Sequence, residues 1–342
     1  MIKINQVKED LAEEIEQVKG FSGAVYVKGK GMTYQGAYGF RNREENLPNN
    51  PTTRFGIASG CKLFTAVAIA QLVDQGLLNF HTRLDECLNL NFTHFDPSIT
   101  IHQLLTHSSG IPDYFDEEGN VNFEELWKEQ PTYELKELKN FLPMFQHERM
   151  KFLPGEKFHY NNAGYIILGL IIEQQTRMKF TDYVEEHVLK KAGMDQSGYF
   201  SINKLPRNTA NGYIDLEDGS WKTNIFSIPI KGGADGGAFV TTPDMVRFWD
   251  SLLNCELISE ENTIVLLSPH AQADNELYYG YGVWMNIAHD EVYKYHVMGY
   301  DPGVSFHSAF YPQLDLTLAA ACNKNVGAYE VVKAVEKVVF HY

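Results

Sequence analysis

The chain has 342 residues, of which 44% are hydrophobic and 21% charged, proportions that are ordinary for a folded protein and exclude large-scale disorder. Its 29 basic and 44 acidic residues give a formal net charge of −15, which repels nucleic-acid phosphates and anionic lipid. We therefore expect neither nucleic acid nor a membrane as a partner. The four cysteines are far apart, which indicates free thiols rather than a disulfide framework.

The N-terminal stretch lacks the basic start, apolar core and small-residue cleavage site of a signal peptide. The longest apolar run, "YIILGLII" at 165–172, is far too short to cross a bilayer. These two observations predict a cytoplasmic protein without a signal peptide or a transmembrane segment.

In chain order, residues 4–18 have helical spacing, and residues 21–40 are typical of two strands around a glycine-containing turn. Helical periodicity then recurs in the middle of the chain, at 60–76, 99–106, 132–146, 162–176, 179–192 and 242–254. Strand patterns return near the C-terminus, at 281–287, 291–297, 304–312 and 314–323. A final helical pattern covers residues 328–340.

This order predicts an α+β fold in which both chain ends build one antiparallel sheet, flanked by terminal helices and joined to a helical region. We assign residues 1–58 with 270–342 to a discontinuous sheet region and residues 59–269 to a mainly helical region. Ligand clefts favour the seam between two such regions, so we expect the active site there.

A serine, Ser59, stands three residues before Lys62 at the start of the apolar helix predicted over 60–76. One helical turn would place both side chains on the same face, and a helix N-terminus favours the negative charge of an alkoxide or oxyanion. The spacing alone is weak evidence for a catalytic pair, because Ser201 and Lys204 have the same spacing. That second pair is followed by "LPRNTANG", a stretch that cannot continue as a helix. The structural alternative is a serine N-cap followed by a solvated lysine.

Two later stretches supply the remaining parts of a nucleophilic site. Tyr160 and Asn162 precede a second apolar helix, where a tyrosine can relay a serine proton and an asparagine can hold a lysine and a substrate amide. A strand ending near Gly299 can offer a backbone N–H to an oxyanion. His107, beside two serines and a glycine, fits a turn better than a catalytic base. No set of residues has metal-ligand spacing, so we expect neither a metal nor a cofactor.

The segments "ITIHQLLTHSSGIPDYF", "FLPGEKFHYNNAGYIILGLIIE" and "GGADGGAFVTTPDMVRFWDSLL" occur in a characteristic order. Over about residues 20–325 the chain resembles the serine β-lactamase and penicillin-binding-protein superfamily, on the branch of class C β-lactamases and related esterases. The resemblance implies that Ser59 is acylated and that Lys62 and Tyr160 share the acid–base work. It also implies that Asn162 orients Lys62 and the substrate, and that the N–H groups of Ser59 and Tyr300 form the oxyanion hole.

The third motif of that family, Lys-Thr-Gly or His-x-Gly, is altered here. Val297, Met298 and Gly299 occupy its positions, and His296 comes one place early. Because neighbouring strand residues point to opposite faces, His296 reaches the site only if a bulge turns it. We retain His296 and Gly299 as candidate substrate-binding residues. The loss of the cation predicts weak recognition of a substrate carboxylate, which favours esters or uncharged amides.

The resulting hypothesis is a serine hydrolase that forms an acyl-enzyme at Ser59. Its substrate is a small-molecule ester, amide or peptide, as for a carboxylesterase, an amidase or a D-amino-acid peptidase, and it acts as a monomer or weak homo-oligomer. One alternative is a β-lactam-binding protein or a weak class C-like β-lactamase. A second alternative is a non-catalytic binding or assembly module on the same fold.

Overall fold

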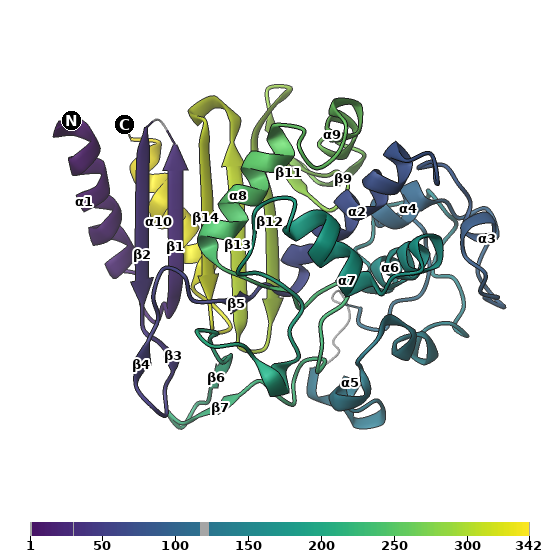
Figure 1. The fold of residues 1–342 in the computed structure, drawn as a ribbon, viewed down its shortest axis with the longest axis horizontal. Helices are drawn as coiled ribbons and strands as arrows, with labels where there is room; N and C mark the ends of the chain where they lie inside the picture. Colours follow the sequence, from purple (N-terminus) through teal and green to yellow (C-terminus); the bar gives the residue numbers. More distant parts are fainter. Residues whose placement is uncertain (1, 30, 117–122, 342) are drawn as a thin grey trace.

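A computed structural model describes residues 2–29, 31–116 and 123–341. Its centre is an antiparallel sheet of eight strands in the order β2-β1-β14-β13-β12-β11-β10-β9 (Figure 1). The strands are β1 (Gly23–Gly29), β2 (Met32–Tyr38), β9 (Ala271–Asp274), β10 (Leu277–Tyr279), β11 (Trp284–Ala288), β12 (Glu291–Asp301), β13 (Val304–Tyr311) and β14 (Leu316–Cys322). Both chain ends supply strands, which confirms the predicted fold class. The short strands β9 and β10 were not predicted.

Helices cover both faces of this sheet. The terminal helices α1 (Ile2–Glu16) and α10 (Ala328–Val339) pack on one face, and α8 (Thr242–Leu253) packs on the other (Figure 1). Every residue of β14 is buried, because Ala319 and Ala321 face one core while Leu318 and Ala320 face the other. The alanines leave room for helices on both sides, which explains the near-continuous apolar run of this strand.

The helical region lies beside the β9 edge of the sheet, around α2 (Lys62–Asp74) and α6 (Asn162–Thr176) (Figure 1). Both helices are apolar on all sides because the protein surrounds them. The other helices are short: α3 (Leu84–Cys87), α4 (Ile101–Leu105), α5 (Phe123–Glu129), α7 (Phe180–Val184) and α9 (Glu260–Leu266). Within the described ranges, no helix combines the length and apolar character that a bilayer span requires.

The prediction of a helix over residues 132–146 is wrong. Three short 3₁₀ turns replace it, at Thr132–Glu134, Leu138–Asn140 and Leu142–Met144. Pro143 lies inside the predicted window and lacks the backbone N–H that an α-helix would need there, so the chain turns instead of continuing.

Three two-stranded sheets complete the fold, and one of them positions the site. The pairs are β3 (Phe40–Asn42) with β4 (Leu47–Pro48), β5 (Phe55–Gly56) with β8 (Phe239–Val240), and β6 (Tyr213–Asp215) with β7 (Trp221–Thr223). Pairing of β5 with β8 brings the segment before Ser59 beside the glycine-rich stretch 232–237.

Candidate active site

Ser59 lies in a 3₁₀ turn, Ala58–Cys61, and α2 begins at Lys62. Two contacts hold the turn: Ile57 N–H donates to the Ala238 carbonyl at 2.9 Å, and the Ala58 carbonyl accepts from Gly237 N–H at 3.2 Å. Ala58 itself has φ +43°, a conformation that costs an alanine energy and persists only where its surroundings impose it. The chain is therefore forced into a sharp corner immediately before Ser59.

Lys62 contacts three other residues of the site. Its Nζ lies 2.9 Å from Ser59 Oγ, 2.7 Å from Asn162 Oδ1 and 2.7 Å from the backbone carbonyl oxygen of Asp235. The side chain is only 1% exposed. A buried amine is tolerated only when its hydrogen-bonding capacity is met, and here three acceptors surround it. This arrangement rules out the alternative of a solvated lysine after a serine cap.

The ring of Tyr160 lies beside Lys62, with Nζ 4.9 Å from the ring centroid. The His107 ring packs against Tyr160 at a centroid distance of 4.3 Å, and Trp284 stacks with Tyr160 at 6.0 Å and 12°. An ammonium this close to an aromatic face is attracted by the negative face of the ring. The structure thus brings Ser59, Lys62 and Tyr160 into one cluster.

His107 holds the loop that delivers Tyr160. Its Nδ1 accepts from Asn161 N–H at 3.0 Å, and its carbonyl accepts from His159 N–H at 2.8 Å. Burial lowers the pKa of His107 well below its usual value, so the ring is neutral and its Nδ1 can act as an acceptor. This agrees with a turn-holding role rather than catalysis.

Asn162 is the first residue of α6, and Asp113 fixes it there. The Asp113 carboxylate accepts from the backbone N–H of Asn162 at 2.7 Å and of Ala163 at 2.9 Å, two amides that have no acceptor within the helix. Burial raises the pKa of Asp113 to about 7, although these hydrogen bonds oppose the shift. From the sequence alone, Asp113 fits the mouth of a cleft and a loop surface equally well. The surrounding sequence, "IPDYFDEE", gives no signal for a contact with α6.

Asp235 was missed by sequence reasoning. Besides its carbonyl contact with Lys62, its buried carboxylate accepts a short hydrogen bond from Tyr114 Oη. Burial raises the pKa of Asp235, while Lys62 and Tyr114 act in the opposite direction. The available signal was the run "GGADGG", which allows the backbone to approach Lys62 closely; Gly236 lies next to Ala58.

The register of β12 places a second backbone donor beside Ser59. Asp301 pairs with Val304 around a two-residue turn, so the N–H groups of Asp301 and Gly299 point to β13 and that of Tyr300 points away from it. Pairing of β11 with β12 ends at His296, which leaves the edge of residues 297–301 open on the site's side. A Cβ built on Gly299 would lie 2.8 Å from Ser59 N, so this edge abuts the nucleophile turn.

The structure does not bring His296 to Ser59. Register between β12 and β13 is continuous from Tyr295 to Asp301, so no bulge turns the histidine. The His296 ring stacks on the His307 ring at a centroid distance of 5.0 Å, on the face of the sheet that α10 covers. Its ring also stacks with that of Trp284 at 6.5 Å, and Trp284 in turn contacts Tyr160. Val297, at the position of the family's cation, is 2% exposed and belongs to the apolar core.

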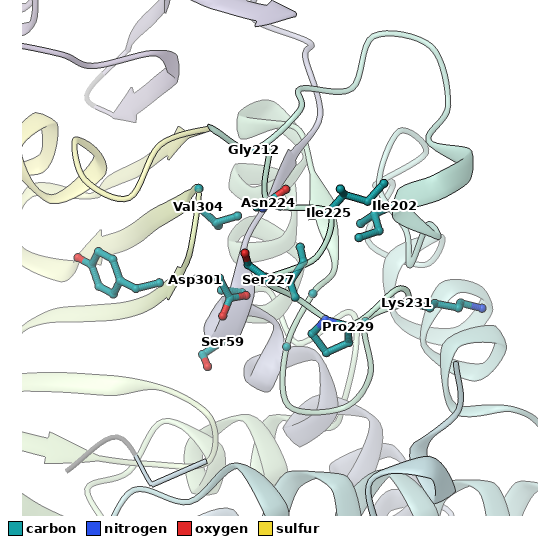
Figure 2. A pocket seen from close by; sticks show the side chains of 18 of the residues that line it. Ser59, Ile202, Gly212, Asn224, Ile225, Ser227, Pro229, Lys231, Asp301 and Val304 are labelled. Carbon is teal, nitrogen blue, oxygen red and sulfur yellow. The ribbon is translucent and has the colours of Figure 1, made fainter. Parts of the chain in front are cut away.

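A cavity of about 520 Å³ opens at Ser59. Figure 2 shows Ser59 and Asp301 on one side of it and Ile202, Ile225 and Pro229 on the other. The remaining wall is largely aromatic and aliphatic and includes Tyr114, Phe115, Trp127, Phe141, Leu205 and Ile228. Such a cavity suits a small organic ligand with an apolar part. Among the residues that the structure describes, no three His, Cys, Asp or Glu side chains are grouped to hold a metal ion.

The chain is similar to known proteins in sequence and in fold. Residues 8–338 match the family described as Beta-lactamase. Protein flp of Staphylococcus aureus (strain MW2) is 30% identical over 57% of this chain, a match that spans only 38% of flp itself. Penicillin-binding protein 4* of Bacillus subtilis (strain 168) is 28% identical over 97% of this chain and 75% of its own length.

A crystal structure of a penicillin-binding protein from Bacillus halodurans is 52% identical in sequence and superposes with a TM-score of 0.93. The superposition covers 96% of this chain and 99% of that one. Family match, sequence identity and fold agree over nearly the whole chain, with the serine, lysine and asparagine in contact at its cleft. This chain belongs to the Beta-lactamase family.

Proposed function

We propose that this protein is a serine hydrolase in which Ser59 Oγ attacks an ester or amide carbonyl and forms an acyl-enzyme. The observation that carries the proposal is the 2.9 Å contact between Lys62 Nζ and Ser59 Oγ. After Lys62 gives up one proton, its amine keeps two N–H donors and gains a lone pair. With those donors on Asn162 Oδ1 and the Asp235 carbonyl, the lone pair faces the Ser59 hydroxyl, in place of the hydrogen bond that Lys62 donates to Ser59 Oγ in this structure.

The reaction then follows from the surrounding groups. The Ser59 proton moves to Lys62, with Tyr160 beside the amine as a candidate relay, while Oγ bonds to the carbonyl carbon. The carbonyl electrons move to oxygen, where the N–H groups of Ser59 and Tyr300 stabilise the oxyanion. The leaving group departs with a proton from the same lysine and tyrosine pair. Water then attacks the carbonyl carbon of the acyl-enzyme in the same way. Ser59 Oγ leaves and takes back its proton, and the carboxylic acid is released.

The side chains of the cleft favour neutral acyl donors over carboxylates. Val297 removes the cation that would attract a carboxylate, so esters and uncharged amides are the preferred substrate class. The names of the two Bacillus relatives favour a β-lactam as an alternative acylating agent. The backbone oxyanion site does not depend on the side chain at position 297, so it fits either class.

The test is intact-mass measurement after incubation with a fluorophosphonate and, separately, with a penicillin, followed by peptide mapping. Wild type, Ser59→Ala and Ser201→Ala are compared. Ser201 is a matched control because it begins the second Ser-x-x-Lys sequence, of which only residues 202–204 form an isolated 3₁₀ turn. We expect a phosphonate adduct on Ser59 in wild type and Ser201→Ala, and none in Ser59→Ala.

The remaining outcomes distinguish the alternatives. A lasting penicillin adduct on Ser59 would favour the β-lactam-binding protein. No adduct from either reagent, and no product from the penicillin, would favour a non-catalytic module. Hydrolysis rates for an ester that carries a free carboxylate and for its methyl ester test the substrate class; a strong preference for the free acid contradicts our interpretation of Val297.

A further inference from the structure

The backbone around Tyr160 does not by itself fix the position of its ring, although the proposed hydrolase function needs a fixed one. Tyr160 belongs to the segment before α6 that forms neither helix nor strand, and its side chain is only partly buried. His107 accepts hydrogen bonds from the backbone N–H groups of the two flanking residues, His159 and Asn161. These bonds leave the side-chain torsions of Tyr160 free, so contacts of the side chain select its rotamer.

Two aromatic rings contact that of Tyr160. The His107 ring lies at a centroid distance of 4.3 Å and an angle of 35°, and the Trp284 indole stacks at 6.0 Å and 12°. Both distances are in the range that aromatic pairs favour. Trp284 comes from the central sheet, as the first residue of β11. Its indole is therefore a contact through which the sheet can set the position of the phenol ring.

Trp284 is itself rigidly held. Its backbone pairs with Tyr279 of β10 on one side and with His296 of β12 on the other. The indole meets the ring of Tyr279 at 4.7 Å and 77° and that of Phe158 at 5.8 Å and 68°, and it stacks with the His296 ring at 6.5 Å. A side chain packed against three rings, on a strand paired at both edges, has few alternative rotamers.

The turn before Trp284 lies against the helix that begins with Lys62. Gly280 N–H donates to the Val283 carbonyl at 2.8 Å, which closes a tight turn between β10 and β11. Within this turn Gly282 has φ +72°, and a Cβ there would lie 2.8 Å from the Lys62 carbonyl oxygen. Only glycine permits so close an approach of the two backbones. The start of β11 and the start of α2 are therefore fixed relative to each other, with Trp284 two residues beyond the contact.

The contacts of Trp284 connect it to the reaction through Tyr160 and not through a substrate. Trp284 is not one of the described residues that line the cavity at Ser59. Its stacking partner Tyr160 has its ring centroid 4.9 Å from Lys62 Nζ. A displacement of about 1 Å in a reacting group costs about 100-fold in rate, so the rate depends on what holds the phenol.

We infer that Trp284 is a positioning residue, which holds the phenol of Tyr160 beside Lys62 so that the two groups can share the Ser59 proton. The inference rests on the proposed function. Trp284 makes and breaks no bond; it transmits the fixed geometry of β11 and α2 to a tyrosine on a loop.

The test measures the second-order rate at which a fluorophosphonate labels Ser59. In that reaction Ser59 Oγ bonds to phosphorus, fluoride leaves, and the serine proton passes to the base. Rates are compared in wild type, Trp284→Leu, Trp284→Phe, Tyr160→Phe and the double variant that combines Trp284→Leu with Tyr160→Phe. Leucine keeps the position apolar without a ring, and phenylalanine restores an aromatic face. Thermal melts verify folding, and Trp284→Met takes the place of Trp284→Leu if the leucine variant does not fold.

Trp221→Leu is the matched control. Trp221 also retains solvent access and packs against a tyrosine, Tyr213, at a centroid distance of 4.9 Å. It lies in β7 and is likewise not among the described residues that line the cavity. Loss of this second indole should leave the labelling rate within about twofold of wild type, since Tyr213 has no contact with Lys62 to lose.

We expect Trp284→Leu to slow labelling about 10- to 100-fold, with part of the loss recovered in Trp284→Phe. Tyr160→Phe should slow it about 100-fold or more. Addition of Trp284→Leu to Tyr160→Phe should then cost no more than about threefold, because the position of a ring without its hydroxyl no longer matters.

Three results overturn the inference: a wild-type rate in Trp284→Leu or in Tyr160→Phe, no recovery in Trp284→Phe, or single effects that multiply in the double variant. Each of them leaves the proposed function standing, because Ser59 is still labelled in wild type. Absence of labelling in wild type instead rejects the hydrolase function, and the inference with it.

Discussion

Substitution of Gly299 by alanine would separate the two backbone elements that we assign to the oxyanion hole. A Cβ at this position would lie 2.0 Å from the Ile57 carbonyl oxygen and 2.8 Å from both Ser59 N and Gly60 N. Ordinary contact begins at 3.4 Å, so the Ile57 contact is about 1.4 Å too short. All three neighbours are backbone atoms that cannot rotate away. Either β12 or the serine turn must therefore move by about an ångström.

That movement misaligns the N–H groups of Tyr300 and Ser59. Loss of one oxyanion donor lowers the rate by about 100- to 1,000-fold, and a misplacement of about 1 Å costs about 100-fold. We therefore expect Gly299→Ala to lower the second-order rate of Ser59 phosphonylation by about 100-fold or more. Overpacking should also lower the free energy of unfolding by about 1–3 kcal/mol.

The matched control is Gly56→Ala, three residues before Ser59. Its Cβ would meet nothing closer than Val304 Cγ2 at 3.4 Å, which is an ordinary contact. Phosphonylation rates of the two variants and wild type are measured by mass spectrometry, with thermal melts to verify folding. If Gly299→Ala reacted at the rate of Gly56→Ala and melted at the same temperature, the close approach of β12 to Ser59 would be refuted.

Three further perturbations test the support of the site. Lys62→Met removes the group that accepts the Ser59 proton and should slow phosphonylation by about 100- to 10,000-fold; an unchanged rate would exclude Lys62 as the base. Tyr114→Phe leaves the buried Asp235 carboxylate without its phenol donor and should lower the free energy of unfolding by about 1–3 kcal/mol in urea; an unchanged midpoint would contradict this hydrogen bond. The raised pKa of Asp113, about 7, means that the native state holds a proton that the unfolded chain has already lost, so Asp113 costs stability as pH rises from about 4 to about 7. Relative to wild type, Asp113→Asn should therefore gain stability across that window, and a stability difference independent of pH would contradict the shift.

The sheet could be predicted because its long strands alternate or run apolar for their whole length. The two strands that were missed, Ala271–Asp274 and Leu277–Tyr279, are short and lie at the exposed edge, where few side chains are buried. In the window 132–146, helical spacing of apolar residues outweighed a single proline in the prediction. In the folded chain, the missing N–H of Pro143 has the larger effect.

The residues of the site that belong to a sequence motif could be predicted, whereas the contacts that support them from outside the motifs could not. Ser59, Lys62 and Asn162 were expected to meet, and their atoms lie within hydrogen-bonding distance. The third acceptor of Lys62 is a backbone carbonyl, which every residue possesses, so the sequence indicated only the glycine-rich run around Asp235 and not the residue itself. Asp113 reaches Asn162 from 49 residues away, through a fold that no local pattern encodes.

The altered third motif illustrates how one strand can separate two roles. Gly299 permits the backbone to approach Ser59, and the register of β12 directs the Tyr300 N–H to the open edge, whatever side chains the strand presents. Val297 stands on the same face of β12 as Gly299, and its buried apolar side chain offers no charge to a substrate carboxylate. Under the proposed function, a substitution at position 297 should therefore change the preference between carboxylates and neutral acyl donors while the Tyr300 N–H keeps its place.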